Sequence, residues 1–375
     1  MPTARGLAVA GTGVLLLVLG VLSEYQELAL LGGVAVAAVV LAVVAVGRPA
    51  AVAVERSPSA VRTSPGAAVD VRLSLRNAGR RAVRAADRVG GHRGERPVRP
   101  QRLAGRAAAE VHYRFRPGRR GLVRLGPLRA GRSDPLGLAA AYRDHGDTDL
   151  VWVHPRWEPL GSVPVGRRAD PDGEADGAPS GALTFHTLRD HVPGDDLRHV
   201  HWRSSARLDR LVVREYIDVS QPRLHVIVDD RPAPGGEDAL DEVASVAASL
   251  VGTGVGASMH CELWLVSGRG RDSAGGLPPM LDLLAEAVPS PDADLEGALR
   301  LARSRPAGDT AILVGGALGT ADLRSFGRLE HHYSSLVAIS VGAAERPAAP
   351  PSVTLLCAGD ARGFAERWNG APWSR

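Results

Sequence analysis

A dense polar run between Phe185 and Tyr216 is the part of the sequence whose residue types could carry out chemistry. The run is FHTLRDHVPGDDLRHVHWRSSARLDRLVVREY, and its candidate metal ligands or acid–base groups are Asp195, Asp196, His199 and His201. Imidazole and carboxylate groups bind zinc and activate water in metal hydrolases. On a helix, however, positions two apart point to different sides, so His199 and His201 would not converge. A metal-dependent hydrolase is therefore the alternative hypothesis.

The same run favours a non-catalytic role, because its charges can pair with one another. The chain contains no Gly-x-Ser-x-Gly or His-Glu-x-x-His motif, which are typical of hydrolytic centres. Pro193-Gly194 suits the centre of a type II turn, and Asp195 or Asp196 then suits the N-cap of a short helix. Arginines and carboxylates at short distances form bidentate pairs. We predict a partly buried ion-pair network, with Trp202 packed beneath it, made of Asp195, Asp196, Arg198 and Arg207.

Two uncharged apolar segments near the N-terminus, residues 6–22 and 28–47, predict a transmembrane helix hairpin. A helix needs about 20 apolar residues to cross the hydrocarbon, with about 17 as the lower limit. A signal peptide is the alternative for the first segment, but a second apolar segment follows at once. Arg5 and Arg48 flank the hairpin, whereas the charged residues in its short connection are all acidic. The positive-inside rule then predicts a multi-pass cell-membrane protein, with bilayer contacts through residues 6–47 and soluble domains in the cytoplasm.

Residues 48–160 alternate between apolar and polar side chains with a period of two, most clearly at 69–75 and 111–115. Half-buried strands separated by turn residues predict an antiparallel β-sandwich. Residues 76–106 are rich in arginine, which suits either a solvated face or contact with lipid head groups or nucleic acid. We favour the solvated face and expect no nucleic-acid partner, because this stretch has no aromatic residue to stack on bases.

The remainder predicts a linker at residues 161–181 and a doubly wound α/β domain at 223–375. The linker is rich in Pro, Gly, Asp and Arg. The predicted strands are 224–228, 260–266, 311–314, 336–341 and 353–357, and the predicted helices are 240–250, 280–288, 295–303 and 364–368. Strands that alternate with helices form a sheet covered on both faces. No GxGxxG or P-loop motif opens a helix, so no nucleotide cofactor is expected.

The polar run also carries a family resemblance. The pattern L-R-x-H-x-P-G-D-D-x-R-x-x-H-W-x-x-S-A-R, followed by L-V-V-R-E-Y, resembles the signature of the domain of unknown function 58 family. Its matching residues are Arg189, Pro193, Gly194, Asp195, Asp196, Arg198, His201, Trp202, Ser205, Ala206 and Arg207. The resemblance implies a membrane hairpin (1–47), a β-sandwich (48–160), a linker (161–181), the signature segment (182–222) and a von Willebrand factor A-like domain (223–375).

The resemblance also directs attention to the loop after the first strand of the α/β domain. Von Willebrand factor A-like domains often bind Mg²⁺ there through a D-x-S-x-S loop, whose oxygens suit a hard cation. Counted from Asp229, the serine positions hold Arg231 and Ala233; counted from Asp230, both hold proline. Neither frame supplies a hydroxyl, so Asp229 and Asp230 are predicted to form a degenerate metal loop with no metal and no cofactor.

Composition is consistent with this view of the chain. Charged residues make up 23% and hydrophobic residues 45%, both near globular averages, so a fully disordered chain is excluded. Cys261 and Cys357 lie far apart in apolar runs, which predicts buried free thiols and excludes a disulfide framework. The leading hypothesis is a non-catalytic membrane scaffold with no evident small-molecule substrate. The resemblance implies a MoxR-type AAA+ ATPase as its partner in an envelope-related or stress-related process.

Overall fold

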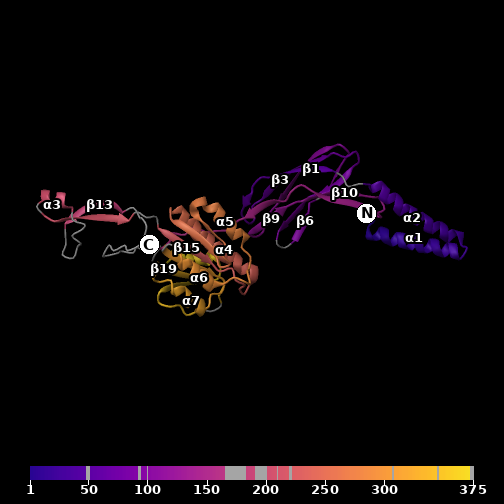
Figure 1. The fold of residues 1–375 in the computed structure, drawn as a ribbon. Coiled ribbons are helices and arrows are strands. Elements are labelled where there is room, and N and C mark those ends of the chain that lie inside the picture. Colours follow the sequence, from indigo (N-terminus) through magenta and orange to yellow (C-terminus); the bar gives the residue numbers. More distant parts are fainter. Residues whose placement is uncertain are drawn as a thin grey trace. The chain divides into compact units, whose positions relative to one another are not determined.

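The computed structural model of the 375-residue chain is shown in Figure 1. It describes residues 1–47, 51–91, 94–98, 100–164, 183–190, 201–208, 210–218, 222–305, 308–343 and 346–371. The chain divides into two compact units: the first comprises Met1–Arg156 and the short stretch Leu284–Glu286, and the second comprises Trp157–Leu283 and Ala287–Arg375. The first unit contains a helix hairpin and a β region, and the second contains an α/β domain.

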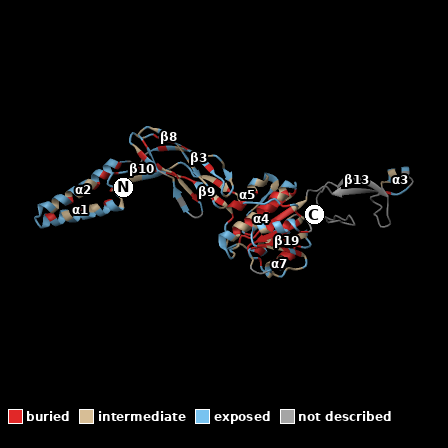
Figure 2. Ribbon diagram, turned by 180° about the vertical axis from the view of Figure 1, so that it is seen from behind, coloured by how far each residue is buried: buried red, intermediate tan, exposed pale blue. Residues whose placement is uncertain are grey.

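The hairpin consists of α1 (Ala4–Leu22) and α2 (Gln26–Val46), as the apolar segments predicted. Their mean hydropathies are 2.0 and 2.8, and both are long enough to cross a membrane. Figure 2 shows that most of their surface is exposed, as apolar helices that face lipid would be. The helices touch backbone to backbone, because a Cβ atom on Gly20 would lie 2.3 Å from the amide nitrogen of Ala29. Small residues permit such close packing between membrane helices.

The β region of the first unit contains three sheets with strand orders β1-β3-β8, β11-β10-β4-β7 and β2-β12-β9-β5-β6. Its strands are β1 (Val52–Pro58), β2 (Arg62–Thr63), β3 (Val69–Asn77), β4 (Val83–Ala86), β5 (Arg88–Gly91), β6 (Gly94–Pro97), β7 (Gln101–Leu103), β8 (Ala108–Phe115), β9 (Gly121–Leu125), β10 (Leu128–Ser133), β11 (Ala140–His145) and β12 (Asp149–Val153). The β2–β12 pair is parallel, whereas the main ladders are antiparallel, including β1–β3 and β3–β8.

The central strand β3 shows how the period-two pattern builds the core of this unit. Buried and exposed residues alternate along its whole length. Its inward side chains join two clusters: Leu73 and Leu75 pack with Leu128, whereas Val69 packs with Leu125. The two ends of β3 therefore pack against two different sheets, the one that contains β10 and the one that contains β9. The strand pattern predicted for residues 69–75 is confirmed.

The second unit contains a six-stranded sheet of order β17-β16-β15-β18-β19-β20. Its strands are β15 (Arg223–Val228), β16 (His260–Leu265), β17 (Gly270–Asp272), β18 (Gly308–Gly315), β19 (Tyr333–Val341) and β20 (Val353–Ala358). The edge strand β17 is antiparallel to β16, and the other pairs are parallel. The helices are α4 (Gly236–Gly256), α5 (Leu277–Glu286), α6 (Leu295–Arg303), α7 (Thr320–Gly327) and α8 (Ala361–Asn369), with a short 3₁₀ helix, η2, at Ser273–Gly275.

Helices cover both faces of this sheet. Leu299 of α6 and Phe326 of α7 share one cluster with Ile227 and Leu313 of the sheet, whereas α4 packs on β15 and β16 together with α8. Figure 2 shows that α4 and the central strands are the most deeply buried part of the unit. The predicted alternation of strands and helices is confirmed, but the short β17 and α7 were not predicted.

The start of the predicted linker is packed on the second unit. The amide of Leu160 donates to Thr253 Oγ1 over 3.2 Å, and Trp368 Nε1 donates to the carbonyl of Ser162 over 2.7 Å. Leu160 and Val163 are both buried. Residues 157–164, which include the end of the predicted β-sandwich (48–160) and the start of the predicted linker (161–181), therefore pack with the α/β domain. The rest of the predicted linker, 165–181, lies outside the described residues.

Candidate functional site

The order of the parallel strands places a crevice at the carboxyl ends of β15 and β18. Strand β15 leads through α4 to β16 on one side, and β18 leads through α7 to β19 on the other. In open α/β sheets, ligands bind where neighbouring strands diverge in this way. The loops at this point begin with Asp229-Asp230 after β15 and with Gly316 after β18. The predicted degenerate metal loop therefore lies at the position where the fold favours a site.

Arg231 binds the carboxylate of Asp229 through two nitrogens. Its Nε lies 2.8 Å from Oδ1 of Asp229, and its Nη2 lies 2.7 Å from Oδ2. Nη2 also lies 3.1 Å from Oδ1 of Asp322, the acidic residue in the first turn of α7. Bidentate guanidinium–carboxylate pairs are strong and geometrically specific. Arg231 thus links the loop after β15 to α7 with a permanent positive charge.

The charge of Arg231 is insensitive to pH. Its hydrogen bonds to Asp229 raise the pKa of the guanidinium above its ordinary value, although partial burial opposes the effect. The negative charges of Asp229 and Asp322 act in the same direction. An arginine is already charged at every physiological pH, so this cation is a fixed component of the site.

Asp230 has a structural role at the same edge. It is 1% exposed, and its Oδ1 accepts a hydrogen bond of 2.9 Å from the amide of Ser267, which follows β16. Its backbone carbonyl accepts another, of 2.7 Å, from the amide of Ser290. A buried carboxylate needs such donors. Asp230 therefore holds neighbouring loops together.

A cleft of about 240 Å³ opens beside Arg231. It is lined by Arg231, Ala293, Asp294, Leu295, Glu296, Ala321, Asp322 and Ser325. Asp294 caps α6 by accepting a hydrogen bond of 3.0 Å from the amide of Glu296. The cleft thus combines three carboxylates with one guanidinium. The sequence offered one signal for it, because an aspartate directly before an amphipathic helix is a typical N-cap.

The carboxylate oxygens at this edge are arranged to bind an arginine rather than a metal ion. Both carboxylate oxygens of Asp229 already accept from Arg231, and Gly315 and Gly316 bring no side chain to the neighbouring loop. A hard divalent cation needs several oxygen ligands that converge. Across the described ranges of the chain, no group of three or more His, Cys, Asp or Glu side chains is placed to hold a metal.

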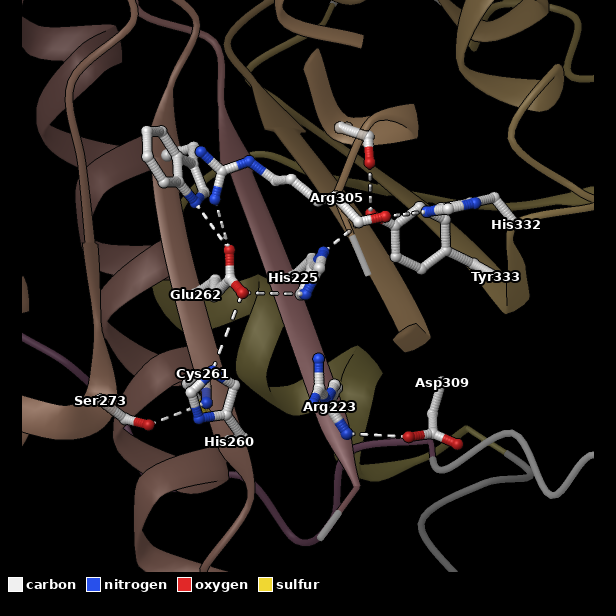
Figure 3. A network of polar contacts seen from close by, with 12 residues as sticks. Arg223, His225, His260, Cys261, Glu262, Ser273, Arg305, Asp309, His332 and Tyr333 are labelled. Carbon is white, nitrogen blue, oxygen red and sulfur yellow. Dashed lines mark hydrogen bonds and ion pairs between the residues drawn. The ribbon is translucent and has the colours of Figure 1, made fainter. Parts of the chain in front are cut away.

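A second polar cluster lies on the sheet face that α6 covers (Figure 3). Nδ1 of His225 lies 2.7 Å from the hydroxyl of Tyr333, and Nε2 of His225 lies 3.5 Å from Oε1 of Glu262. The other carboxylate oxygen of Glu262 accepts from Nη1 of Arg305 at 2.7 Å and from Nε1 of Trp264 at 3.2 Å. Sequence reasoning missed this cluster, because its residues stand singly within apolar strands.

Burial and charge set the protonation of this cluster. Burial lowers the pKa of His225, partly offset by the charge of Glu262, so the imidazole is neutral at pH 7. Burial opposes ionisation of Glu262, but the positive charge of His225 when it is protonated, together with hydrogen bonds from Trp264 and Arg305, lowers the pKa of the carboxyl overall. The adjoining cavity measures only about 30 Å³, room for about one water molecule. The cluster therefore contributes polar contacts within the core of the second unit.

The signature segment contains the antiparallel strands β13 (Leu183–Asp190) and β14 (Val212–Asp218), with α3 (Trp202–Leu208) between them. Arg189 pairs with Val213 in this ladder. Ser205 is buried, and its Oγ accepts a hydrogen bond of 2.9 Å from the amide of Val212. The motif thus fastens the helix to the second strand.

The predicted site residues of α3 are mostly exposed. Trp202 is 64% exposed, and Arg207 and Ala206 are also exposed. The prediction that Trp202 packs beneath an ion-pair network is therefore wrong. His201 precedes α3 and accepts a hydrogen bond of 3.1 Å at Nδ1 from the amide of Ser204, as a helix cap does. The remaining predicted residues, Pro193, Gly194, Asp195, Asp196 and Arg198, and also His199, lie outside the described residues.

Comparison with known proteins gives distant similarities. No known protein-family profile matches the chain. An uncharacterized protein of Bacillus subtilis, YeaD, is 24% identical over 135 residues, which are 35% of this chain and 34% of YeaD. The chain thus matches about a third of the length of that relative.

Solved structures resemble parts of the chain only loosely. The CARDB domain of the PF1109 protein from Pyrococcus furiosus is 14% identical, with 28% of this chain and 94% of that domain covered and a TM-score of 0.20. The alkylpurine DNA glycosylase AlkC of Pseudomonas fluorescens is 11% identical, with 33% and 40% covered and a TM-score of 0.21. Similarities at this level assign neither a fold nor an activity to the chain.

Proposed function

We propose that the chain is a non-catalytic, membrane-anchored scaffold that binds a protein partner at the carboxyl edge of its α/β domain. The observation that carries this proposal is the pairing of Arg231 with Asp229 and Asp322. A built-in cation there takes the place of a bound metal ion, and a charged cleft of about 240 Å³ lies beside it. Such a cleft suits recognition through charge complementarity.

The proposal includes a more specific fold. We infer that the β region is a β-sandwich and that the α/β domain is von Willebrand factor A-like, as in the domain of unknown function 58 family. In support, the sheet is doubly wound, with one short antiparallel strand at its edge. The signature residues, from Arg189 to Arg207, precede that domain in the order that the family resemblance implies.

The membrane orientation is also part of the proposal. We infer that α1 and α2 cross the cell membrane and that everything after α2 faces the cytoplasm. Arg5 and Arg48 flank the hairpin, whereas Glu24 lies in its turn and Glu27 in the first turn of α2. Alkaline phosphatase fused after Val54 should therefore be inactive, whereas a fluorescent protein that folds in the cytoplasm should be active at the same position. The reverse pattern would refute this topology.

The partner we propose, from the family resemblance, is a MoxR-type AAA+ ATPase. The acidic rim formed by Asp294, Glu296 and Asp322 fits a basic surface of such a partner. Reversing one interfacial charge changes affinity by about 1.4 kcal/mol or more, which is about tenfold. Glu296→Lys should therefore reduce recovery of the co-expressed ATPase about tenfold in a quantitative pull-down.

Glu330→Lys is the matched control for this experiment. Glu330 is exposed and lies just before β19, at the opposite edge of the parallel sheet. The same charge change there should leave the recovery of the ATPase unaltered. Equal losses for the two variants would indicate a general charge effect and contradict binding at the carboxyl edge.

The pairing of Arg231 with Asp229 predicts that the carboxyl edge of the α/β sheet binds no metal ion. Addition of Mg²⁺ should leave the melting temperature of the detergent-solubilised chain unchanged. A ligand at 100 times its dissociation constant would add about 2.7 kcal/mol of stability, which is readily detected. A Mg²⁺-dependent rise in the unsubstituted chain that Asp229→Ala abolishes would contradict the prediction.

A further inference from the structure

The first residues of the chain are hydrogen-bonded to the loop between β10 and β11. The terminal amine of Met1 donates to the carbonyl of Ala140 over 2.9 Å, and the amide of Thr3 donates to the carbonyl of Leu138 over 2.9 Å. The hydroxyl of Thr3 donates to the carbonyl of Gly137 over 2.6 Å and accepts from the amide of Gly6 as the N-cap of α1. We call residues 134–139 the foot loop, because α1 begins directly on it.

The end of α2 is fixed to the same β region. Val39, Ala42 and Val46 share an apolar cluster with Leu138 of the foot loop. Nη1 of Arg81 donates to the carbonyl of Ala45 over 2.7 Å, where a cation also complements the dipole at the helix end. Both ends of the hairpin are thus attached to the β region by side-chain and backbone contacts.

The foot loop has a defined shape. Asp134 accepts from the amide of Leu136 at 2.8 Å and from that of Ala139 at 2.6 Å. These backbone hydrogen bonds lower the pKa of the Asp134 carboxyl below its ordinary value, so it remains an acceptor at neutral pH. Gly137 has a φ of +70°, which glycine adopts without strain.

This shape directs one large apolar side chain away from the core. Leu138 is 5% exposed and belongs to the cluster with α2, whereas Leu136, two residues earlier, is 63% exposed. The loop therefore presents an uncovered leucine next to the residue that hydrogen-bonds to the N-cap of α1. Packing within the first unit gives no reason for a leucine at this position.

The depth of Leu136 relative to a bilayer follows from these contacts. A Cβ atom on Gly6 would lie 2.0 Å from the carbonyl oxygen of Leu138, so the first turn of α1 touches the backbone of the foot loop. The head-group layer adds about 5–8 Å on each side of the hydrocarbon. A loop in contact with the first turn of a membrane-spanning helix must therefore lie within that layer.

We propose that the foot loop is a second membrane contact, in which Leu136 enters the boundary between head groups and acyl chains of the bilayer. Arg5 lies in the first turn of α1, and Arg81, between β3 and β4, contacts the end of α2; both are exposed. In this proposal both guanidinium groups bind lipid phosphates. Arginine presents several N–H donors to phosphate, and basic residues beside a membrane helix favour anionic lipids. This inference rests on the proposed membrane anchoring, and it adds a fixed contact between the β region and the lipid surface.

The test places a fluorophore on the foot loop of the full chain. Leu136→Cys is labelled with an environment-sensitive dye in a Cys357→Ser background and reconstituted into vesicles of phosphatidylcholine and phosphatidylglycerol. Cys261 is retained, because it is fully buried and burial raises the pKa of its thiol to about 12, which keeps it unreactive. A nitroxide attached near the head of a lipid acyl chain serves as the quencher.

Arg116→Cys, labelled in the same way, is the matched control. Arg116 is exposed and follows β8 at the end where Phe115 pairs with Val69. The opposite end of this ladder, which pairs Arg76 with Ala108, leads to Arg81, so the control site lies about 24 Å along the strands from the foot of the hairpin. The quencher should act several-fold more strongly on the label at position 136 than on the label at 116.

The outcomes separate this inference from the proposed anchoring. If alkaline carbonate releases the chain from membranes, the anchoring itself fails. If the chain resists carbonate and the two labels are quenched equally, the anchoring stands and the foot-loop contact is overturned. Substituting Arg5→Gln and Arg81→Gln together should weaken quenching at 136, and unchanged quenching would exclude the two arginines from the contact.

Discussion

Replacing Arg56 with methionine should lower the free energy of unfolding of the first unit by about 3–5 kcal/mol, because the change leaves a buried charge uncompensated. The side chain of Arg56 is 3% exposed and that of Asp87 is fully buried. Two of the guanidinium nitrogens contact the Asp87 carboxylate at 2.7 and 3.0 Å, and a third lies 2.8 Å from Asp149. Denaturant unfolding followed by a probe in the β region would measure the loss.

The rest of the network shows why Asp87 cannot relax after this substitution. The hydroxyl of Tyr113 donates to Asp87 over 2.7 Å. Burial, the hydrogen bond and the charge of Asp87 together raise the pKa of Tyr113 above its ordinary value, so this residue stays a neutral donor. Burial opposes the charge on Arg56, but its hydrogen bonds to Asp87 and Asp149 outweigh burial and raise its pKa. Arg56 is thus the only cation among these four residues.

Arg114→Met is the matched control, because it breaks an equally short ion pair on the same unit. Nε of Arg114 lies 2.7 Å from Asp70, but the two side chains are 60% and 57% exposed. Exposed pairs contribute only about 0–1 kcal/mol. Adding Asp87→Leu to Arg56→Met should recover most of the stability by removing the stranded charge. Equal losses from Arg56→Met and Arg114→Met would contradict this view.

The elements of the fold could be predicted because their signals are local. The alternation along residues 69–75 specifies β3, and α6 spans the residues that helical spacing predicted, 295–303. The short β17 and α7 carry too few apolar residues for a periodicity to emerge. The loop-like composition of residues 161–164 predicts linker, but the carbonyl of Ser162 accepts a hydrogen bond from Trp368, and no local pattern contains that contact.

The candidate site could be predicted in part for the same reason. The loop Asp229-Asp230 is predictable because it follows a buried strand, and Arg231 stands where the metal-binding pattern requires a serine. Its second partner, Asp322, lies far along the chain and meets Arg231 only when α7 packs on the sheet. The exposure of Trp202 was not predicted, because a motif specifies residue types and not the surface that covers them.

Glu262→Ala should lower the free energy of unfolding of the second unit by about 3 kcal/mol. This is the low end of the range for breaking a buried ion pair, because the side chain of Arg305 is partly exposed to solvent. The change leaves the guanidinium of Arg305 and the indole of Trp264 without the carboxylate oxygen that both contact, and it removes the carboxylate that lies 3.5 Å from Nε2 of His225. His260→Ala is the matched control. His260 approaches the same carboxylate only to 3.8 Å, and its side chain is 36% exposed, so its loss should be small.

The pH dependence of the Glu262→Ala effect tests the coupling between Glu262 and His225. The pKa of His225 is lowered by burial and partly restored by Glu262. Below about pH 6.5 the unfolded chain protonates this histidine more readily than the folded chain does, so stability falls as pH falls. Without Glu262 the folded-state pKa drops further, and the gap between variant and unsubstituted chain should widen as pH falls from about 6.5 to 5.

At lower pH the gap should narrow again, because the folded-state pKa of Glu262 is itself lowered. Stability that a carboxylate contributes is fully present above its unfolded pKa, about 4.3, and is lost as pH falls through its folded pKa. The difference between the two proteins should therefore pass through a maximum in mildly acidic solution. A difference that shrinks steadily from neutral pH downward would show that His225 and Glu262 titrate independently and that the buried cluster does not act as one unit.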